Sequence, residues 1–340
     1  MNQSTLDTQL QIDPLNDNVF ITKHPLWRPS GARGIFGGVT IAQSLKAAQL
    51  TVPTDMNAHS MHCCFVSAGS ASIPITYHVE RVRDGRSFSN RSVKAIQNQR
   101  TIFLAMISFT RTETGKFIEH VERMPHLPAP PKENTTNEPA TPYINHSVGI
   151  LNNASPPSDK RIHQWIKARG AVSETNHLAS LAFMSDSYFL AAIPHVHNIW
   201  HFVDPPLTEF YGPGPAHAAR YPYARVQRPH LGERCDGPDK RVGMMVSLDH
   251  TIYFHHPRGF SPEEWILSEL QTHWAGDGRG VIMQKMWTRE GVLIATCVQE
   301  VCFLLLLLVD FANLYLSGNC PTRRTRKESP LIDHDIDEWR

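Results

Sequence analysis

The sequence lacks the short motifs that identify the commonest hydrolases and nucleotide enzymes. G-x-S-x-G, G-x-x-x-x-G-K-[ST], H-E-x-x-H and C-x-x-C do not occur in the 340 residues. These absences remove the simplest signatures of a serine hydrolase with a nucleophile elbow, a P-loop enzyme and a zinc protease. The formal net charge is only +1, so the chain has no overall attraction to nucleic acid and we expect no nucleic-acid partner.

Cysteine is sparse, and a secretion signal is lacking. The six cysteines include one adjacent pair, Cys63 and Cys64, whose side chains would point to opposite faces of a strand. We interpret the cysteines as reduced thiols in a reducing compartment rather than as disulfides or zinc ligands. The N-terminal segment has no cationic stretch followed by an apolar core, so we do not expect secretion.

A late apolar run, from Val301 to Leu316, is too short for a membrane-spanning helix. It is interrupted by Asp310 and Asn313, and a span requires about 20 apolar residues. Its first part is predicted to be the last strand of a sheet, and the basic cluster TRRTRKE that follows is interpreted as a solvated tail. Stable membrane insertion is therefore not expected.

What the chain does contain is an internal repeat. The tripeptide Asp-Gly-Arg begins at Asp84 and again at Asp277, and the flanking segments match at a nearly constant spacing, as His62 and His250 do. Each copy has three segments with the composition of β-strands joined by tight turns. The predicted strands are 74–82, 88–96 and 101–110 in the first copy and 265–273, 279–287 and 292–303 in the second.

An apolar helix is predicted before each group of strands, over 37–50 and 177–194. Both segments are apolar around most of the helix circumference, so each helix must be covered by the sheet beside it. The predicted fold class is α+β, with an antiparallel sheet wrapped around one central helix and this unit present twice. A length of 340 residues agrees with about two domains.

The domain boundary is predicted from a change in composition. The stretch 124–159 is rich in Pro, Asn and Thr and has no periodicity, so we interpret it as a linker. It separates an N-terminal domain, 1–123, from a C-terminal domain, 160–308, and an atypical tail covers 309–340. A Pro/Gly/His-rich insertion at 205–238 is interpreted either as a cover over a cleft or as a long surface loop.

Three polar residues lie in otherwise apolar segments of the second copy. Asp186 is placed inside the predicted helix, Gln299 inside the last strand, and Ser247 at the start of the first strand. A helix cap, an outward-facing strand residue and an edge hydroxyl stay open as structural explanations. The first copy has His59 and Phe109 in place of Ser247 and Gln299 and has no acid in its helix. This asymmetry favours one active site, in the second half.

Seven segments, in order along the chain, resemble the acyl-CoA thioesterase II family, which has bacterial and peroxisomal members. They are RGIFGGVTIAQSL, HSMHCCFVSAG, ITYHVERVRDGRSFSNRSVKAIQ, MSDS, SLDHTIYFHHP, GRG and VQE. The resemblance covers 26–300 apart from the linker and the insertion. It implies the double hot dog fold, which agrees with the repeat, and hydrolysis of acyl-CoA thioesters to a free acid and CoA.

The resemblance also implies a set of catalytic residues. The family's Asp in the SD motif falls on Asp186, its Ser or Thr before LDH on Ser247, and its Gln in QEG on Gln299. Asp186 would orient or deprotonate the attacking water, and the other two would position it. No cofactor and no metal is required. A serine nucleophile at Ser247 would need a histidine, and we expect His250, three residues along the strand, to lie on the opposite face.

Further residues are candidates for binding the acyl-CoA substrate. Gly37 and Gly38 open a predicted helix, where backbone N–H groups can bind an oxyanion. Arg86 and Arg279 are candidates for the phosphates of CoA, and His59 is included as a further substrate-binding residue. A homo-oligomer is also expected, because paired hot dogs commonly extend their sheets by association.

Two other functions stay open at this point. One is a hot dog protein that binds acyl-CoA or an acyl carrier without turnover, or a variant inactivated by its tail, since QE is followed by VCFLLLLLVDF where the family has a glycine. The other is a dehydratase or hydratase of enoyl thioesters, which would need an acid/base set that could include His59 or His62. No motif for such a set is found, and convergence of Asp186, Ser247 and Gln299 would favour the hydrolase.

The cellular location is predicted from the resemblance alone. It implies a peroxisomal protein, although the chain ends Glu338-Trp339-Arg340 and not in a small-basic-Leu tripeptide. The alternative prediction is a cytoplasmic protein.

Overall fold

The computed structural model describes residues 5–29, 32–111, 118–131, 141–197 and 240–307. The N-terminal half contains α1 (Leu6–Gln9), β1 (Ile12–Asn16), β2 (Val19–Thr22), α2 (Gly37–Gln49), β3 (Met56–Phe65), β4 (Thr76–Asp84), β5 (Phe88–Gln97) and β6 (Arg100–Arg111). The C-terminal half contains β7 (Tyr143–Leu151), η1 (Pro157–Asp159), β8 (Arg161–Ala168), η2 (Glu174–Asn176), α3 (His177–Ser185), α4 (Phe189–Val196), β9 (Lys240–Ser247), β10 (Asp249–Phe254), β11 (Ile266–Gly276), β12 (Arg279–Thr288) and β13 (Leu293–Leu307).

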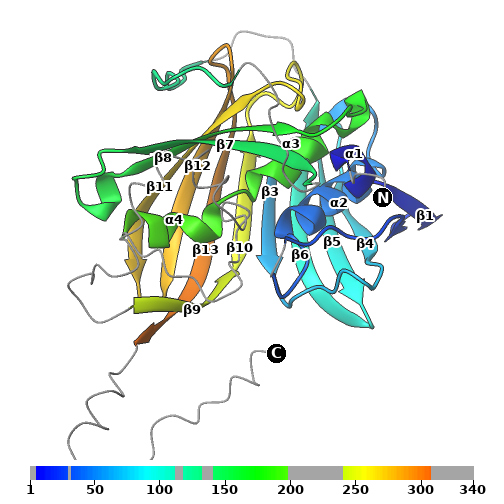
Figure 1. The fold of residues 1–340 in the computed structure, drawn as a ribbon. Coiled ribbons are helices and arrows are strands. Elements are labelled where there is room, and N and C mark those ends of the chain that lie inside the picture. The colour runs from blue at the N-terminus through cyan, green and yellow to red at the C-terminus, as the bar shows by residue number, and fades with distance from the viewer. Residues whose placement is uncertain (1–4, 30–31, 112–117, 132–140, 198–239, 308–340) are drawn as a thin grey trace, which may run out of the picture.

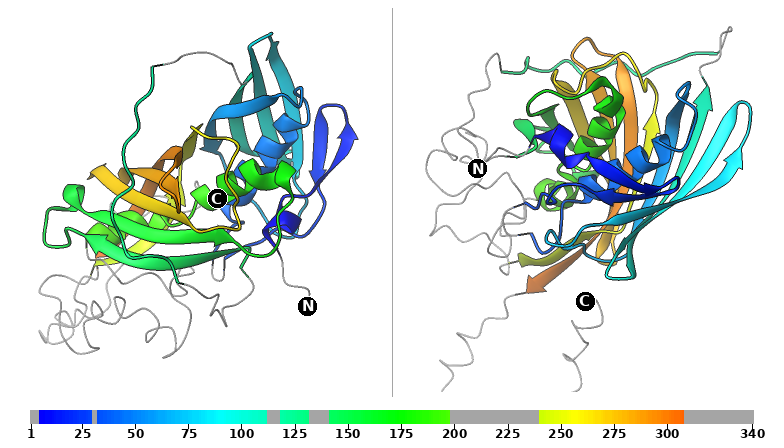
Figure 2. Two further views of the ribbon diagram at one scale, coloured as in Figure 1. Left: turned by 90° about the horizontal axis from the view of Figure 1, so that it is seen from above. Right: turned by 90° about the vertical axis from the view of Figure 1, so that its right-hand side faces the viewer.

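The strands of both halves join in one antiparallel sheet (Figure 1). Its order is β1-β2-β4-β5-β6-β3-β10-β13-β12-β11-β8-β7, and β9 pairs with β13. The halves meet where β3 pairs with β10. Figure 2 shows each half of the sheet curving around its own helices. The predicted α+β architecture, an antiparallel sheet around a helix present twice, is therefore confirmed.

The central helices are buried because they are covered on two sides. α2 lies against the inner face of β3, β4, β5 and β6, and α3 packs against α2 where the halves meet (Figures 1 and 2). Ile41 and Leu45 of α2 and Leu181 and Phe183 of α3 are completely buried. Burial of each such side chain contributes about 1.5–3 kcal/mol. The wide apolar surface predicted for both helices is explained by this double covering.

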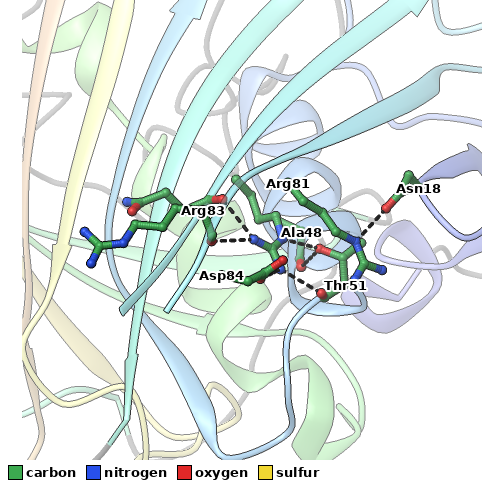
Figure 3. Close-up of polar contacts among 8 residues, drawn as sticks. Asn18, Ala48, Thr51, Arg81, Arg83 and Asp84 are labelled. Carbon is green, nitrogen blue, oxygen red and sulfur yellow. Dashed lines mark hydrogen bonds and ion pairs between the residues drawn. The ribbon is translucent and has the colours of Figure 1, made fainter. Parts of the chain in front are cut away.

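A buried arginine attaches the C-terminal end of α2 to the sheet. The side chain of Arg91, on β5, is completely buried. Its Nε donates to Thr51 Oγ1 over 2.8 Å and its Nη2 to the Thr51 carbonyl over 2.9 Å. The remaining N–H groups reach the carbonyls of Arg83 and Asn90 and the carboxylate of Asp84; Figure 3 shows Thr51, Arg83 and Asp84 in this cluster. All five guanidinium N–H donors are thus satisfied.

The predicted strands are confirmed to within a few residues by β4, β5, β6, β11, β12 and β13. β13 extends from Leu293 to Leu307, so the first part of the late apolar run is the last strand, as predicted. The matched histidines differ in orientation, however. His62 is exposed and lies opposite Thr251, whereas His250 is buried and lies opposite Cys63. The repeat is therefore shifted by one residue between β3 and β10.

The helix predicted over 177–194 is two helices. α3 ends at Ser185, Tyr188 has a left-handed conformation with φ of 73°, and α4 begins at Phe189. Asp186 is consequently the C-cap of α3 and does not lie inside a helix. Short polar side chains such as Ser and Asp compete for backbone hydrogen bonds and favour helix ends. The sequence Ser-Asp-Ser at 185–187 accounts for the break.

The stretch interpreted as a linker, 124–159, contains regular structure. β7 lies within it and pairs with β8 from Tyr143, opposite Ala168, to Leu151, opposite Arg161. The expectation of a linker without secondary structure was wrong here because β7 is an edge strand with only partial burial, which leaves little periodicity. The insertion at 205–238 and the tail at 309–340 lie outside the described residues.

Across the described segments, no helix has the length and apolar character that crossing a membrane would require.

Candidate active site between the two halves

The three residues predicted to be catalytic lie together in the structure. Asp186 is the C-cap of α3, Gln299 lies within β13, and Ser247 is the last residue of β9, so it does not begin a strand as expected. Gln299 connects the other two. Its Nε2 donates to Ser247 Oγ over 2.7 Å, and its side chain also hydrogen-bonds the Asp186 carboxyl group. Gln299 is completely buried and does not face outward from the sheet.

The start of α2, from the other half of the chain, contacts Asp186. A Cβ atom added to Gly37 would lie 2.6 Å from Asp186 Oδ2, and one added to Gly38 would lie 2.3 Å from the carbonyl oxygen of Phe183. Only glycine permits so close an approach of α2 to α3. The backbone N–H of Gly38 hydrogen-bonds the Asp186 carboxyl. The first N–H groups of any helix have no acceptor within the helix, and the Asp186 carboxyl supplies the acceptor for that of Gly38.

The Asp186 carboxyl group is poorly hydrated and correspondingly hard to ionise. Burial raises its pKa to about 7, although the hydrogen bonds from Gln299 and Gly38 act to lower it. The residue as a whole keeps part of its surface exposed, although its carboxyl group lies among dense protein surroundings. A carboxyl group with a pKa near neutrality can both accept and return a proton at physiological pH.

His250 belongs to the same hydrogen-bond network. Its Nδ1 lies 2.5 Å from Gln299 Oε1, and its Nε2 lies 2.9 Å from the hydroxyl of Ser185. The side chain is completely buried. Loss of hydration lowers the pKa of His250 to about 4, although the Gln299 hydrogen bond acts to raise it. The imidazole is therefore neutral at physiological pH.

The expectation that His250 faces away from Ser247 was wrong because of an extra residue. Ser247 lies opposite Val301, and Thr251 lies opposite Val298. The segment from Ser247 to Thr251 thus has one residue more than the facing part of β13, which is a β-bulge. The extra residue shifts the alternation of side chains and turns His250 toward Gln299. His250 lies within the motif SLDHTIYFHHP, but strict alternation of side chains along the strand predicted that it would face away from Ser247.

The other substrate-binding candidates lie outside this network. His59 Nε2 lies 2.8 Å from Ser108 Oγ, and its ring contacts Phe88 edge-on. Arg86 is exposed, and its carbonyl accepts a hydrogen bond from Arg111. Arg279 pairs with Glu300 at 2.8 Å while its side chain stays 46% exposed. Glu300 adjoins Gln299 in β13, so the Arg279–Glu300 pair lies on the face of the strand opposite to Gln299.

Within the described ranges, no group of three or more His, Cys, Asp or Glu side chains is arranged to hold a metal ion. The four cysteines in these ranges are free thiols. Burial raises the pKa of Cys63 and of Cys297, so both thiols are protonated at neutral pH.

Comparisons with known proteins point to one family. Residues 24–110 match the family model described as the acyl-CoA thioesterase N-terminal domain, and residues 118–303 match the acyl-CoA thioesterase C-terminal domain. The chain is 32% identical to acyl-coenzyme A thioesterase 8 of Homo sapiens over 324 residues, which cover 86% of each protein.

A relative in Saccharomyces cerevisiae, peroxisomal acyl-coenzyme A thioester hydrolase 1, is 28% identical over 338 residues, with 88% of this chain and 94% of the relative covered. Among solved structures, the acyl-CoA thioesterase II TesB2 of Mycobacterium marinum aligns with a TM-score of 0.63 and 26% identity. That alignment covers 93% of this chain and 99% of the other.

Proposed function

Because the chain belongs to the acyl-CoA thioesterase II family and is an acyl-CoA thioester hydrolase, we propose that Asp186 orients and deprotonates the water that attacks the thioester. The observation that supports this mechanism is the convergence of Asp186, Gln299 and Ser247, together with an Asp186 pKa of about 7. A carboxylate held in place by two donors and partly open to solvent can hold one water molecule at the reacting carbon.

The reaction proceeds in two steps. The water oxygen bonds to the thioester carbon while one water proton passes to the Asp186 carboxylate. The tetrahedral intermediate then collapses, the C–S bond breaks, and the proton passes from Asp186 to the departing CoA thiolate, which gives a free acid and CoA. A thiol has an ordinary pKa of about 8.5, so an acid with a pKa of about 7 is well matched to protonate it.

The developing oxyanion is stabilised by the start of α2. Backbone N–H groups at a helix start carry a partial positive charge. The Gly38 N–H is bonded to Asp186, so we assign the neighbouring Gly37 N–H to the oxyanion. A serine nucleophile fits less well, because Gln299 lies between Ser247 and His250 and the pKa of His250 is only about 4.

The mechanism is tested with Asp186→Asn in an assay of acyl-CoA hydrolysis followed by thiol release, across acyl chains of increasing length. We expect kcat to fall by about 10²- to 10⁴-fold with KM little changed. In the unaltered protein kcat/KM should rise with pH through about 7, because the base must be ionised. A folded Asp186→Asn protein with normal turnover would sink the mechanism, and no turnover by the unaltered protein would favour a binding protein.

We also propose the acyl-CoA contacts, the assembly and the location. Arg279 binds a CoA phosphate, since its guanidinium is exposed beside the strand that carries Gln299. The protein is a homo-oligomer, as paired hot dogs commonly are. A peroxisomal location is supported by the name of the yeast relative and is tested by imaging a tagged chain; a cytoplasmic signal would contradict it.

A further inference from the structure

The amide of Gln299 must have one particular orientation for the site to work. Its Nε2 donates to Ser247 and its side chain bonds Asp186. An amide has a donor end and an acceptor end of nearly the same shape. If it were rotated by half a turn, its carbonyl oxygen would face the ionised Asp186 carboxylate, and two acceptors would oppose each other. A group on the far side of the amide must therefore prevent that rotation.

His250 is the group on that far side. Gln299 Oε1 lies 2.5 Å from His250 Nδ1, in a location where both side chains are completely buried. An amide oxygen only accepts hydrogen bonds, so Nδ1 must carry the hydrogen. A neutral imidazole has one N–H, so Nε2 is then an acceptor. The Ser185 hydroxyl lies 2.9 Å from Nε2 and 2.9 Å from the Ala182 carbonyl oxygen, and with the hydrogen of the imidazole on Nδ1 its own hydrogen must turn from that carbonyl toward Nε2.

We infer that His250, as the tautomer with its hydrogen on Nδ1, is a positioning residue that holds the Gln299 amide in the orientation that Asp186 and Ser247 require. The hydrogen bonds run in one direction, from the Ser185 hydroxyl through the imidazole and the amide to the carboxylate. Such a chain is fixed only when every donor has an acceptor. This inference rests on the proposed function of Asp186.

The other titratable groups near Asp186 do not disturb this arrangement. Cys63 on β3 and Cys297 on β13 both lie close enough to be influenced by its charge. Burial raises the pKa of both thiols and lowers that of His250, so all three groups are neutral while Asp186 titrates. Asp249, which adjoins His250 and accepts a hydrogen bond from the Glu300 N–H, also has its pKa raised by burial, so Asp249→Asn is assayed beside the His250 variants to assign a change in the pH profile to Asp186.

The test compares two substitutions of His250, one that keeps a hydrogen-bond donor near the position of Nδ1 and one that keeps none. Asparagine places its amide nitrogen near the position of Nδ1, and leucine offers no donor. We expect His250→Leu to lower kcat by about 10- to 100-fold, since a misplaced catalytic group costs about that much, with KM unchanged. The midpoint of the kcat/KM profile should also move above pH 7, because Asp186 would lose a hydrogen bond that lowers its pKa. His250→Asn should recover most of both losses.

A matched control is His163, another buried histidine on the same sheet, which bonds Glu269 at 2.7 Å outside this network. His163→Leu should destabilise the fold and leave the pH midpoint in place. Asp186→Asn is assayed in parallel. If Asp186→Asn abolishes turnover while His250→Leu keeps normal kcat and midpoint, the inference on His250 fails alone; if Asp186→Asn is active, the proposed function has failed.

A second measurement is independent of activity. The ring ¹⁵N shifts of histidine-labelled full-length protein show which nitrogen carries the hydrogen, and the His250 signals are assigned by their loss in His250→Asn. A hydrogen on Nδ1 is the expected result. A hydrogen on Nε2 would overturn the inference even if the variants were inactive.

Discussion

The two halves of the molecule both bury polar groups beside their helices, but they complete the hydrogen bonds of these groups to different degrees. Every N–H of the Arg91 guanidinium in the N-terminal half has an acceptor. Gln284 occupies the corresponding position of the C-terminal half. Arg91 on β5 pairs with Ile107 on β6, and Gln284 on β12 pairs in the same way with Cys297 on β13. The Oε1 of Gln284 has no hydrogen-bond partner among the described residues.

The same contrast holds at the active site. Asp186 has two hydrogen-bond donors, and yet burial leaves its pKa at about 7. A fully satisfied polar cluster makes a fold rigid, whereas an incompletely stabilised charge stays available for chemistry. The comparison teaches that the two copies of one fold differ in what they contribute: the first anchors a helix and supplies its start to the candidate site, and the second carries the carboxyl group that is proposed to act on water.

Removing the anchor should have the largest effect on stability. Arg91→Met leaves the carbonyls of Thr51, Arg83 and Asn90 without their buried donor, so we expect the free energy of unfolding to fall by about 3 kcal/mol. Turnover per folded molecule should change little. Urea denaturation and activity measurements on one preparation check both. Arg81→Met is the control, since Arg81 is exposed and its Nε donates to Asn18 Oδ1 (Figure 3). Equal losses in the two variants would contradict the anchor role.

A substitution at the start of α2 should lower both the stability of the fold and kcat. Gly38→Ala would place its Cβ against the Phe183 carbonyl, which forces α2 away from α3. We expect a loss of about 2 kcal/mol in stability and a loss of kcat of at least about 10-fold, because the N–H that bonds Asp186 moves. At Gly34 the nearest atom would be 3.2 Å away, so Gly34→Ala should be milder. Unchanged kcat in a folded Gly38→Ala protein would separate the helix start from the site.

The carboxyl group should lower stability in the pH range where it works. The folded pKa of Asp186, about 7, lies above the ordinary value of 3.8, so the folded state holds the proton more tightly. Stability from this group therefore falls as the pH rises from 3.8 to 7 and is least above 7. We expect Asp186→Asn to be more stable than the unaltered protein at pH 8.5 by about 1–2 kcal/mol, discounted for the partial exposure of Asp186.

At pH 5.5 the difference between these two proteins should shrink, because Asp186 is protonated there in the folded state. Urea denaturation at both pH values measures it. A difference that is the same at pH 5.5 and pH 8.5 would show that Asp186 is not the titrating group.

The smallest expected effect concerns substrate binding. Arg279 is half exposed and already paired with Glu300, so Arg279→Ala should raise KM for acyl-CoA by a few-fold with kcat unchanged, as removal of a uniform binding contact does. The effect should weaken with added salt, since it depends on an exposed charge. Arg86→Ala, on the other half, is the comparison variant; an effect only at Arg86 would move the CoA site to the N-terminal half.

Local patterns predicted the strands well and the site only in part. Alternation and the Asp-Gly turns located β11 and β12, and the turn between them has positive φ at Asp277 and Gly278, as a tight hairpin requires. Gly85 of the first copy has no such φ, although the tripeptide is the same. Asp186, Ser247 and Gln299 were found from their polarity and the resemblance, but His250 was excluded by a rule that holds only within one regular strand.

The sequence by itself determined the duplication, the two groups of antiparallel strands with their central helices, and the residue types of the site, because hydrophobic periodicity and turn residues act over a few neighbouring positions. Only the tertiary structure decided that α3 ends at Asp186, that an extra residue before Thr251 turns His250 inward, and that Gly38 of the first half completes the site of the second. Each of these depends on contacts between segments far apart in the chain, and no local pattern records which distant groups will satisfy a hydrogen bond.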